Sequence, residues 1–387
     1  MKKKYKIGII HHNILEHKGG GDFVCAWFLE SLKNEYEITY LTWGRNIDFN
    51  EVNNYYGTNI KNNEINVLYN SLLTRLKLNN RPYHLILALL ELFVKKYYYK
   101  FDLLISTYNE FDFYKKGIQY IHGPSRSDYA AQLYLTDYKN SILRNFYHKS
   151  CDFFSGFNFE RMKKNLTLVN SNWTGNVVKK VFGEINTITL YPPVLIDCKN
   201  TWEKRETGFL CIGDLLPEKK VIEAINLIGK LREIYKYNIH LHIIGNGTGS
   251  YAQKVKNICK KYKWIFFEGR MNREEISKII NNHKYGIHMR NYEGFGIAVA
   301  EMAKGGCIPF IPEGGGQTEA IGNNTHLLFR SEEEAVSKIK FLLDSPSLQI
   351  EIQKYLLSYT KIFSIDNFKN KLKSCIESFL TCKEIIV

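Results

Sequence analysis

The chain has 387 residues, of which 44% are hydrophobic and 24% charged, and its formal net charge is +14. This length exceeds one ordinary hydrophobic core, so a globular protein of two domains is expected. The longest apolar run, 85–94, contains Glu91 and is far shorter than the ~20 residues of a spanning helix, which excludes a transmembrane protein. The eight cysteines form no C-x-x-C pair and predict reduced thiols in a cytoplasmic setting, with neither a disulfide framework nor a zinc site.

The positive charge suits an anionic partner, which is a nucleotide, a nucleic acid or an acidic membrane. It is spread along the chain, with 26 basic and 18 acidic residues before residue 201 (+8), against 27 and 21 after it (+6). A nucleic-acid-binding protein would instead gather its lysines and arginines on one face. The even spread therefore disfavours that class.

Apolar runs of strand length alternate with helical patterns in the first half of the chain. The basic N-terminus has too short an apolar stretch for a signal peptide and is predicted to be a first strand. A glycine loop follows it, with Asp22 as the predicted N-cap of a helix that runs through Leu32. The predicted strands are Lys6–His12, Ile38–Trp43, Ile65–Tyr69, Leu103–Thr107, Gly117–Ile121, Leu166–Asn170 and Thr187–Tyr191.

A second alternating series begins after Tyr191-Pro-Pro193 and a polar stretch. Its predicted strands are Phe209–Ile212, Ile239–Ile244, Ile265–Phe267, Tyr285–Met289 and Ile308–Ile311, with a helix over 221–235 and only helical patterns from 332 onward. The pattern predicts two doubly wound α/β domains with parallel sheets. We expect a first domain over 1–193, a linker over 194–207, a second domain over 208–365, and a C-terminal helix over 366–387 that crosses back to the first domain. Ligands of such sheets bind beyond the carboxyl ends of the strands, here in the cleft between the domains.

The stretch from Arg290 to Glu301 carries the strongest site signal. Glu293 follows a predicted buried strand and precedes Gly294-Phe295-Gly296, after which helix-forming residues lead to Glu301. A strand, glycine turn and helix in this order direct backbone N–H groups and a helix N-terminus at an anion. A carboxylate beside such a turn suits a ligand with sugar hydroxyls joined to phosphate. On spacing alone, an ordinary βα unit with two solvated glutamates is equally compatible.

Three further stretches are candidates of the same kind. Gly19-Gly20-Gly21 follows the first strand, where backbone amides approach a phosphate or an acceptor closely, although it is not a G-x-G-x-x-G fingerprint. Lys219 stands beside Lys220 at the start of a helix and is able to reach a diphosphate, or is simply solvated. His122 ends a strand before Gly123-Pro124 and either meets a ligand or is a hydrogen-bonded structural histidine. D-x-D, H-E-x-x-H and G-x-S-x-G are absent, which gives no support to a metal site or a hydrolase elbow.

Taken together, these stretches resemble the retaining GT-B glycosyltransferases of family 4. Glu293-Gly-Phe-Gly-Ile-Ala-Val-Ala-Glu301 is similar to the paired-glutamate motif of that family, and Gly213-Asp-Leu-Leu-Pro-Glu-Lys219 to its Gly-Arg-Leu-x-x-Glu-Lys segment. Other blocks resemble the branch that contains the lipid-linked-oligosaccharide α-1,2-mannosyltransferase and prokaryotic relatives. They are His12 to Gly21, Tyr120-Ile-His-Gly-Pro124, Asn170-Ser-Asn-Trp-Thr174, Leu190-Tyr-Pro-Pro193 and His288 to Glu301.

The resemblance implies a GT-B fold and a role for each matching residue. Glu293 would hold the hydroxyls of the donor sugar and support positive charge at the transition state, and Glu301 would bind the ribose. Lys219 would bind the diphosphate, and His122 would face the donor sugar from the first domain. Asp214 replaces the arginine of the family, so another cation must complete the phosphate clamp, with Arg290 preferred over Arg270. The donor-binding residues expected from the loops are Gly20, Gly21, Arg290, Gly294, Phe295, Gly296 and Glu301.

The resemblance implies hexose transfer, of mannose or a related sugar, from a GDP- or UDP-linked donor to an acceptor hydroxyl on a lipid-linked or cell-surface glycan. It implies retention by front-face attack, without a metal or other cofactor. A GT-B sugar-nucleotide epimerase is the alternative, since it shares the fold and the donor. Basic and apolar residues from Arg75 to Lys100 also predict an interfacial helix, hence a cytoplasmic protein at the inner membrane face; the alternative is a core helix with solvated ends.

Overall fold

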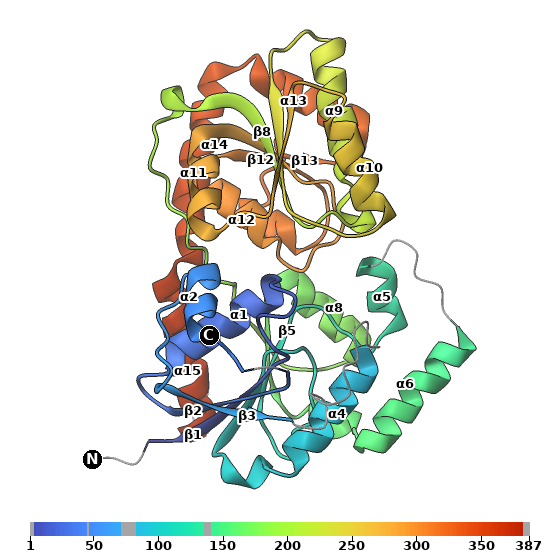
Figure 1. Cartoon of the computed structure of the whole chain (residues 1–387), viewed down its shortest axis with the longest axis vertical. Helices are drawn as coiled ribbons and strands as arrows, with labels where there is room; N and C mark the ends of the chain where they lie inside the picture. Colours follow the sequence, from blue (N-terminus) through green and yellow to red (C-terminus); the bar gives the residue numbers. More distant parts are fainter. Residues whose placement is uncertain (1–3, 45, 71–82, 135–140, 382–387) are drawn as a thin grey trace. The chain divides into compact units, whose positions relative to one another are not determined.

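The computed structural model describes residues 4–44, 46–70, 83–134 and 141–381. The chain divides into two compact units, each built around one parallel sheet (Figure 1). The first unit contains the strands before Pro193 together with the chain from Asp366 onward. The second contains Val194–Ile365.

The first unit has a seven-stranded sheet in the order β3-β2-β1-β4-β5-β6-β7. All of its strand pairs are parallel, and the order reverses direction between β1 and β4, as in a doubly wound sheet. Its strands are β1 (Lys6–Ile10), β2 (Glu37–Thr42), β3 (Ile65–Tyr69), β4 (Leu103–Ser106), β5 (Ile118–Ile121), β6 (Leu166–Val169) and β7 (Thr187–Thr189).

Helices cover both faces of this sheet. One side of the core is closed by α1 and by the last helix, because Phe28 and Phe368 meet edge to face with ring centroids 5.7 Å apart. On the other side, α4 packs its apolar residues against Ile10, Leu41 and Leu104. The helices are α1 (Gly20–Leu32), α2 (Phe49–Tyr56), α4 (Tyr83–Lys95), η1 (Tyr98–Lys100), α5 (Asp128–Tyr134), α6 (Ile142–Ser155), α7 (Phe159–Met162), α8 (Asn172–Phe182) and α15 (Ile365–Thr381).

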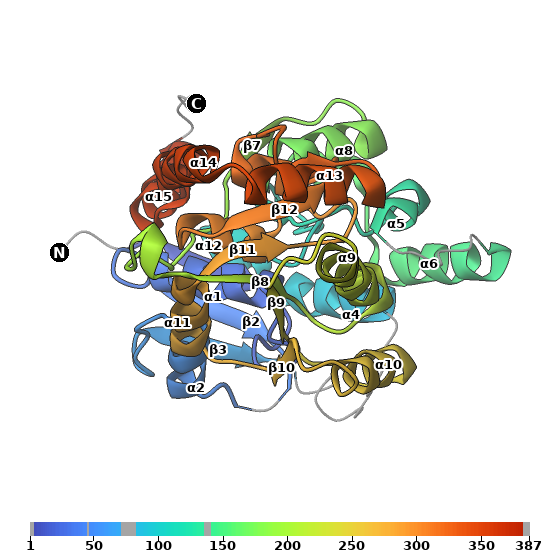
Figure 2. The ribbon, with the colours of Figure 1, turned by 90° about the horizontal axis from the view of Figure 1, so that it is seen from above.

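The second unit has a six-stranded parallel sheet in the order β10-β9-β8-β11-β12-β13. Its strands are β8 (Glu206–Ile212), β9 (His240–Ile244), β10 (Ile265–Gly269), β11 (His283–Ile287), β12 (Ile308–Pro312) and β13 (Leu328–Phe329). Both views place α9, α10 and α13 on one side of this sheet and α11, α12 and α14 on the other (Figures 1 and 2). These helices are α9 (Val221–Glu233), α10 (Ser250–Cys259), α11 (Arg273–Asn282), α12 (Ile297–Lys304), α13 (Glu332–Leu343) and α14 (Pro346–Tyr359), with η2 (Trp202–Lys204), η3 (Pro217–Lys219), η4 (Gly316–Ile321) and η5 (Thr360–Phe363).

The predicted fold class is confirmed, and each of the twelve predicted strands is present with ends shifted by up to three residues. The short strand β13 escaped prediction because two apolar residues carry no periodicity. The predicted N-cap was wrong. Gly19 is the N-cap of α1, and Asp22 stands three residues further on, where its carboxylate accepts the Gly19 N–H at 2.7 Å.

The segment predicted as a linker, 194–207, is packed into the second unit instead. Trp202 is buried, and β8 already begins at Glu206. The Arg205 guanidinium, which is 3% exposed, donates to the carbonyls of Ile280 and His283, each at 3.0 Å, and so holds the segment against α11 and β11. The polar sequence therefore predicted a linker at a place where a buried arginine in fact binds backbone carbonyls. Within the described parts of the chain, no helix is both long enough and apolar enough to cross a bilayer.

Candidate active site

Glu293 lies in the loop that joins β11 to α12. Its side chain is largely buried and surrounded by cations. Lys219 donates to the Glu293 carboxylate, the Arg290 guanidinium lies 3.4 Å from the same oxygen, and His288 Nε2 lies 3.7 Å away. Burial alone would raise the pKa of Glu293, but the charges of Lys219 and Arg290, with the hydrogen bond from Lys219, outweigh it and hold the pKa well below its usual value. The group is therefore an ionised carboxylate at neutral pH.

His288 is the buried neighbour of this carboxylate. Burial lowers its pKa to about 4, and the positive charges of Lys219 and Arg290 also act against its protonation, although the charge of Glu293 favours it. It is therefore a neutral imidazole at pH 7. The four side chains together hold one negative charge against two positive ones.

A second glycine turn supports the Glu293 loop from behind. Gln317, completely buried, accepts the backbone N–H of Glu293 at 2.7 Å and donates to the carbonyl of Arg290 at 3.1 Å. The Gly316 N–H donates to the Glu293 carbonyl at 2.7 Å. Gly315 has φ of +79°, and a side chain there would overlap with the backbone at Tyr292 and Glu293. The turn at 314–316 thus sets the position of Glu293.

Lys219 is held at the other side of the carboxylate by the loop after β8. It ends the short helix η3, and its methylene chain passes over Gly213. Gly245, at the end of β9, has φ of +150°, and a Cβ there would overlap with the Gly213 carbonyl. The neighbouring strands β8 and β9 are thus each followed by a glycine, Gly213 and Gly245. Because these glycines have no side chains, the two loops approach each other closely beneath Lys219.

Glu301, the second glutamate of the motif, is on the buried side of α12. Its carboxylate pairs with the guanidinium of Arg273, the first residue of α11. The helix begins after Gly296, which is its N-cap and has φ of +76°. Phe295 is buried and packs its ring against Phe363 at 5.1 Å between centroids, so the glycine turn is anchored by an apolar contact. Gly294 to Gly296 thus stand at the positive end of the α12 dipole.

Asp214 is paired with a cation other than the neighbouring lysines. Its carboxylate lies 3.8 Å from the guanidinium of Arg270, and about half of each side chain is exposed. An exposed pair of this kind contributes at most about 1 kcal/mol. Arg270 is therefore an available cation next to the position where the resembling family has its arginine.

The first unit brings together the residues predicted there. His122 follows β5, and Gly21 lies against its ring, since an added Cβ would stand 3.5 Å from Nε2. The ring Nε2 of His122 donates to the Thr107 carbonyl at 3.2 Å. The backbone N–H of His122 donates to the side-chain oxygen of Asn109 at 2.8 Å. Burial lowers the pKa of His122 to about 4, so the ring is neutral at pH 7.

Two groups in the described residues have ligand atoms close enough to share a metal ion. In the first unit they are the buried side chains of His11, His12 and Asp22, with Asp22 Oδ1 at 3.3 Å and 2.6 Å from the two imidazoles. The second group, His240, His242 and His283, is in the second unit.

Sequence reasoning missed three residues of the second unit's site. His288, Gln317 and Arg273 contact the loop or the two glutamates, but none stands in a motif with a spacing of its own. His288 begins one of the blocks that carry the resemblance, and three glycines precede Gln317, but neither pattern indicates a contact with Glu293. Glu293, Lys219 and Arg290 are brought together, whereas Glu301 pairs with Arg273.

The comparisons with known proteins agree with this geometry. Residues 196–358, nearly the whole second unit, match the family of glycosyl transferases group 1. Sucrose-phosphate synthase from Thermosynechococcus elongatus shares the fold with a TM-score of 0.75 and 12% identity, over 98% of this chain and 100% of that one. WaaG, a glycosyltransferase involved in lipopolysaccharide biosynthesis, shares it with a TM-score of 0.70 and 13% identity, over 96% and 99%. The chain therefore has the GT-B fold, and its second unit matches a glycosyltransferase family.

Two curated relatives match the predicted branch of these glycosyltransferases. Both are GDP-Man:Man(3)GlcNAc(2)-PP-Dol alpha-1,2-mannosyltransferases. The one from Dictyostelium discoideum is 26% identical over 240 residues, which are 56% of this chain and 47% of the relative. The one from Candida glabrata is 25% identical over 164 residues, which are 38% and 32%. The alignments span less than half of either relative. The predicted relationship to GT-B glycosyltransferases near this branch is confirmed.

Proposed function

We propose that this glycosyltransferase moves a hexose from a nucleotide diphosphate sugar to an acceptor hydroxyl, with retention at the anomeric carbon. The observation that carries the proposal is the ionised, buried Glu293, held among three basic side chains at the start of α12. Sugar hydroxyls donate to a carboxylate, while a diphosphate needs cations and a helix N-terminus. Both requirements are met within one loop.

Each residue has a distinct part in the proposed reaction. Glu293 accepts hydroxyl protons of the donor sugar and supports the positive charge that develops at the anomeric carbon. Lys219 and the start of α12 stabilise the charge that builds on the leaving diphosphate. Glu301 binds the ribose, with Arg273 fixing its orientation. His122, held with Gly21 in the first unit, contributes to binding of the transferred sugar, and the leaving phosphate accepts the proton of the acceptor hydroxyl.

The proposed donor is GDP-mannose, because both curated relatives are named for GDP-Man. The rival is a UDP-sugar, since HepE from Anabaena, which has the same fold with a TM-score of 0.70, is solved with UDP-glucose. The purified chain is screened by thermal shift against GDP, UDP and their sugars, because a ligand of the native state raises the melting temperature. A larger shift with GDP-mannose than with UDP-sugars supports the assignment, and the reverse order refutes it.

Transfer is then measured with GDP-mannose and a lipid-linked glycan acceptor. Acceptor-dependent release of GDP and an α-linked product, seen by NMR, support retaining transfer. Conversion of the donor without an acceptor would indicate the epimerase alternative. The proposal includes metal independence, so activity abolished by EDTA and restored by magnesium would contradict that part.

Because the proposed acceptor is linked to a lipid, the proposal includes binding of the first unit to a membrane surface. The helix predicted to be interfacial does not supply the contact, because α4 buries Leu87, Leu90 and Phe93 in the core. Arg75, Lys77 and Arg81, which belonged to the same prediction, lie outside the described residues. The exposed apolar surface is on α6, where five large side chains are between 72% and 89% exposed: Ile142, Leu143, Phe146, Phe153 and Phe154.

An apolar helix face with basic neighbours suits the headgroup region of an anionic bilayer. Arg144 and Lys149 are exposed on α6 itself, Lys95 ends the adjacent α4, and Lys96 follows it. The test is flotation with anionic and neutral liposomes. We expect stronger recovery on anionic vesicles, and a loss of about tenfold in Phe153→Ser/Phe154→Ser. Phe341→Ser, an exposed phenylalanine of the second unit, is the control. Equal recovery on both vesicle types, or none, contradicts the proposal.

A further inference from the structure

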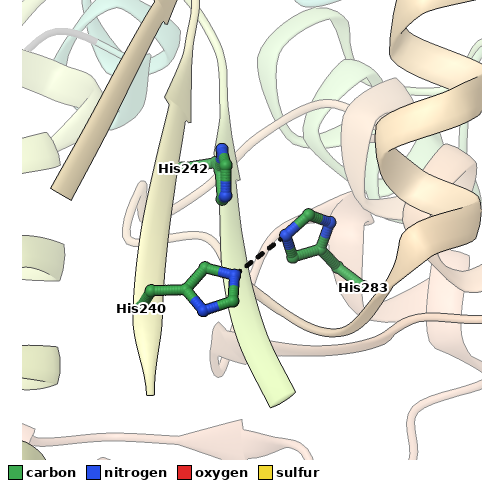
Figure 3. Close-up of side chains that lie close together, drawn as sticks. All are labelled: His240, His242 and His283. Carbon is green, nitrogen blue, oxygen red and sulfur yellow. Dashed lines mark hydrogen bonds between the residues drawn. The ribbon is translucent and has the colours of Figure 1, made fainter. Parts of the chain in front are cut away.

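Three histidine side chains gather at the amino-terminal ends of the strands in the second unit (Figure 3). His240 begins β9 and His283 begins β11, while His242 stands two residues after His240 and so points to the same face of the sheet. The proposed donor site is elsewhere, since Glu293 and Lys219 follow the carboxyl ends of β11 and β8. The cluster is therefore separate from the transfer chemistry.

A glycine on the intervening strand makes this arrangement possible. In the sheet, β8 lies between β9 and β11, and its residue Gly208 is directly opposite His240. A Cβ at Gly208 would overlap with the His240 ring. Because there is no side chain, the ring crosses over β8 and brings its Nε2 to 3.1 Å from His283 Nε2. The backbone thus leaves a space that the two imidazoles share.

The distances fit a metal ion with little movement. One ring nitrogen from each histidine lies within 4.8 Å of the others. Zinc binds imidazole nitrogen at about 2.0–2.1 Å in tetrahedral sites, which places two ligand nitrogens roughly 3.3 Å apart. The separation of 3.1 Å between the two Nε2 atoms is already close to this value. Glu206, the residue that begins β8, has a carboxylate oxygen 3.5 Å and 3.9 Å from the same two nitrogens.

Hydrogen bonds on the far side of two rings leave their Nε2 atoms ready to ligate. His283 Nδ1 lies 2.8 Å from the carbonyl of Ile279, which only accepts, so Nδ1 carries the proton. His242 Nδ1 lies 2.7 Å from the Glu268 carboxylate, which fixes the same tautomer. Metal-ligating histidines characteristically donate their other N–H to a carbonyl or a carboxylate in this way.

The third ring, that of His240, would change its tautomer on metal binding without changing its charge. Since His283 Nε2 only accepts, the hydrogen bond between the rings requires a proton on His240 Nε2. A metal ion takes the place of that proton, which moves to Nδ1 of the same ring.

We propose that His240, His242 and His283 bind one divalent transition metal ion of the zinc type, with Glu206 as the fourth ligand. Imidazole and carboxylate donors in tetrahedral geometry favour zinc over magnesium or calcium. The ion ties together the amino ends of β8, β9 and β11, so its role is structural. No sequence motif indicates this site, because Glu206, the pair His240 and His242, and His283 belong to three different strands that lie far apart in the sequence.

The test uses the full chain without an affinity tag, stripped of metal with EDTA and then freed of EDTA. Titration with zinc chloride is followed by calorimetry, and cobalt chloride by visible absorption, since tetrahedral Co²⁺ absorbs far more strongly than octahedral Co²⁺. We expect tetrahedral Co²⁺ absorption and a higher melting temperature with zinc. His240→Gln, a partly exposed position that leaves the core intact, should bind one zinc fewer per chain. Glu268→Gln should weaken affinity about 10- to 100-fold because it releases the His242 ring.

His326→Gln, at an exposed histidine of the same unit, is the matched control and should bind zinc like the unaltered chain. A stoichiometry that stays unchanged in His240→Gln would assign the zinc to other ligands and overturn the proposal, as would octahedral Co²⁺ absorption in the unaltered chain. EDTA should lower the melting temperature without lowering the rate of sugar transfer. This readout keeps the metal site distinct from the proposed function.

Discussion

Replacing Gln317 with leucine tests whether the turn at 314–316 positions Glu293, the proposed catalytic carboxylate. The Gln317 side chain is completely buried and makes two hydrogen bonds, one to each end of the loop that carries Glu293. Leucine has a similar volume and makes neither bond. The change therefore removes the support and leaves the four charged or titratable side chains of the site in place.

The cost follows from the two backbone groups that lose their partner. The N–H of Glu293 and the carbonyl of Arg290 are left unpaired, each at about 1–3 kcal/mol, so we expect a loss of about 2–6 kcal/mol in the free energy of unfolding. For a unit of this size the loss lowers the melting temperature by roughly 5–25 °C. A displacement of Glu293 by about 1 Å is expected to lower kcat about 100-fold.

The assay combines thermal unfolding with the rate of hexose transfer at saturating donor, at a temperature where the variant is folded. Gln349→Leu is the matched control, because Gln349 is also buried and donates to two carbonyls, at 2.8 Å and 3.1 Å, but belongs to α14. We expect both variants to lose similar stability and only Gln317→Leu to lose kcat. Equal kcat values in the two variants would show that the turn stabilises the fold without positioning Glu293.

Two further results are expected for the same site. Glu293→Gln keeps the shape and removes the charge, so kcat should fall by about 10²–10³ while the Kd for nucleotide changes little; near-normal kcat would refute the assignment. The folded-state pKa of His288 is about 4, below the ordinary value of 6.5, so its contribution to stability is complete above pH 6.5 and is lost as the pH falls toward 4. Between these values, the free energy of unfolding should fall by about 1.4 kcal/mol per pH unit more steeply in the unaltered chain than in His288→Asn, as measured by urea unfolding. Parallel slopes would contradict this reasoning.

The fold was predictable because each strand of a parallel sheet is buried on both faces. Such strands appear in the sequence as short continuous apolar runs, as at Ile38–Trp43 and Ile308–Ile311, and the helices between them are amphipathic. The packing of segment 194–207 into the second unit was not predicted, because it depends on Arg205. A charged residue in a sequence does not indicate that carbonyls of α11 and β11 will surround it.

The site was predictable only in part for a similar reason. Glu293 and Lys219 each belong to a motif that is one continuous stretch of sequence within a single loop. Both residues can therefore be recognised from the sequence alone. Gln317 and His288 act on Glu293 through the fold, and Arg273 reaches Glu301 from the preceding helix. Contacts between loops of neighbouring strands leave no periodicity. The expected solvated alternative for Glu293 and Glu301 is wrong, because both carboxylates are largely buried and paired.

The last prediction concerns which arginine binds the diphosphate in place of the residue lost at Asp214. Arg290 was the preferred candidate, but its guanidinium is 18% exposed and stands 3.4 Å from the Glu293 carboxylate, whose charge it helps to stabilise. Among the residues that the structure describes, Arg270 has Asp214 as its one ion-pair partner, at 3.8 Å and with about half of both side chains exposed, so a diphosphate with about two negative charges competes successfully for it. We therefore expect Arg270→Ala to weaken binding of the nucleoside diphosphate about tenfold and that of the monophosphate much less, as measured by calorimetry. Arg290→Ala should lower kcat and leave the ratio of the two affinities unchanged. A selective loss of diphosphate affinity in Arg290→Ala, with none in Arg270→Ala, would return the role to Arg290.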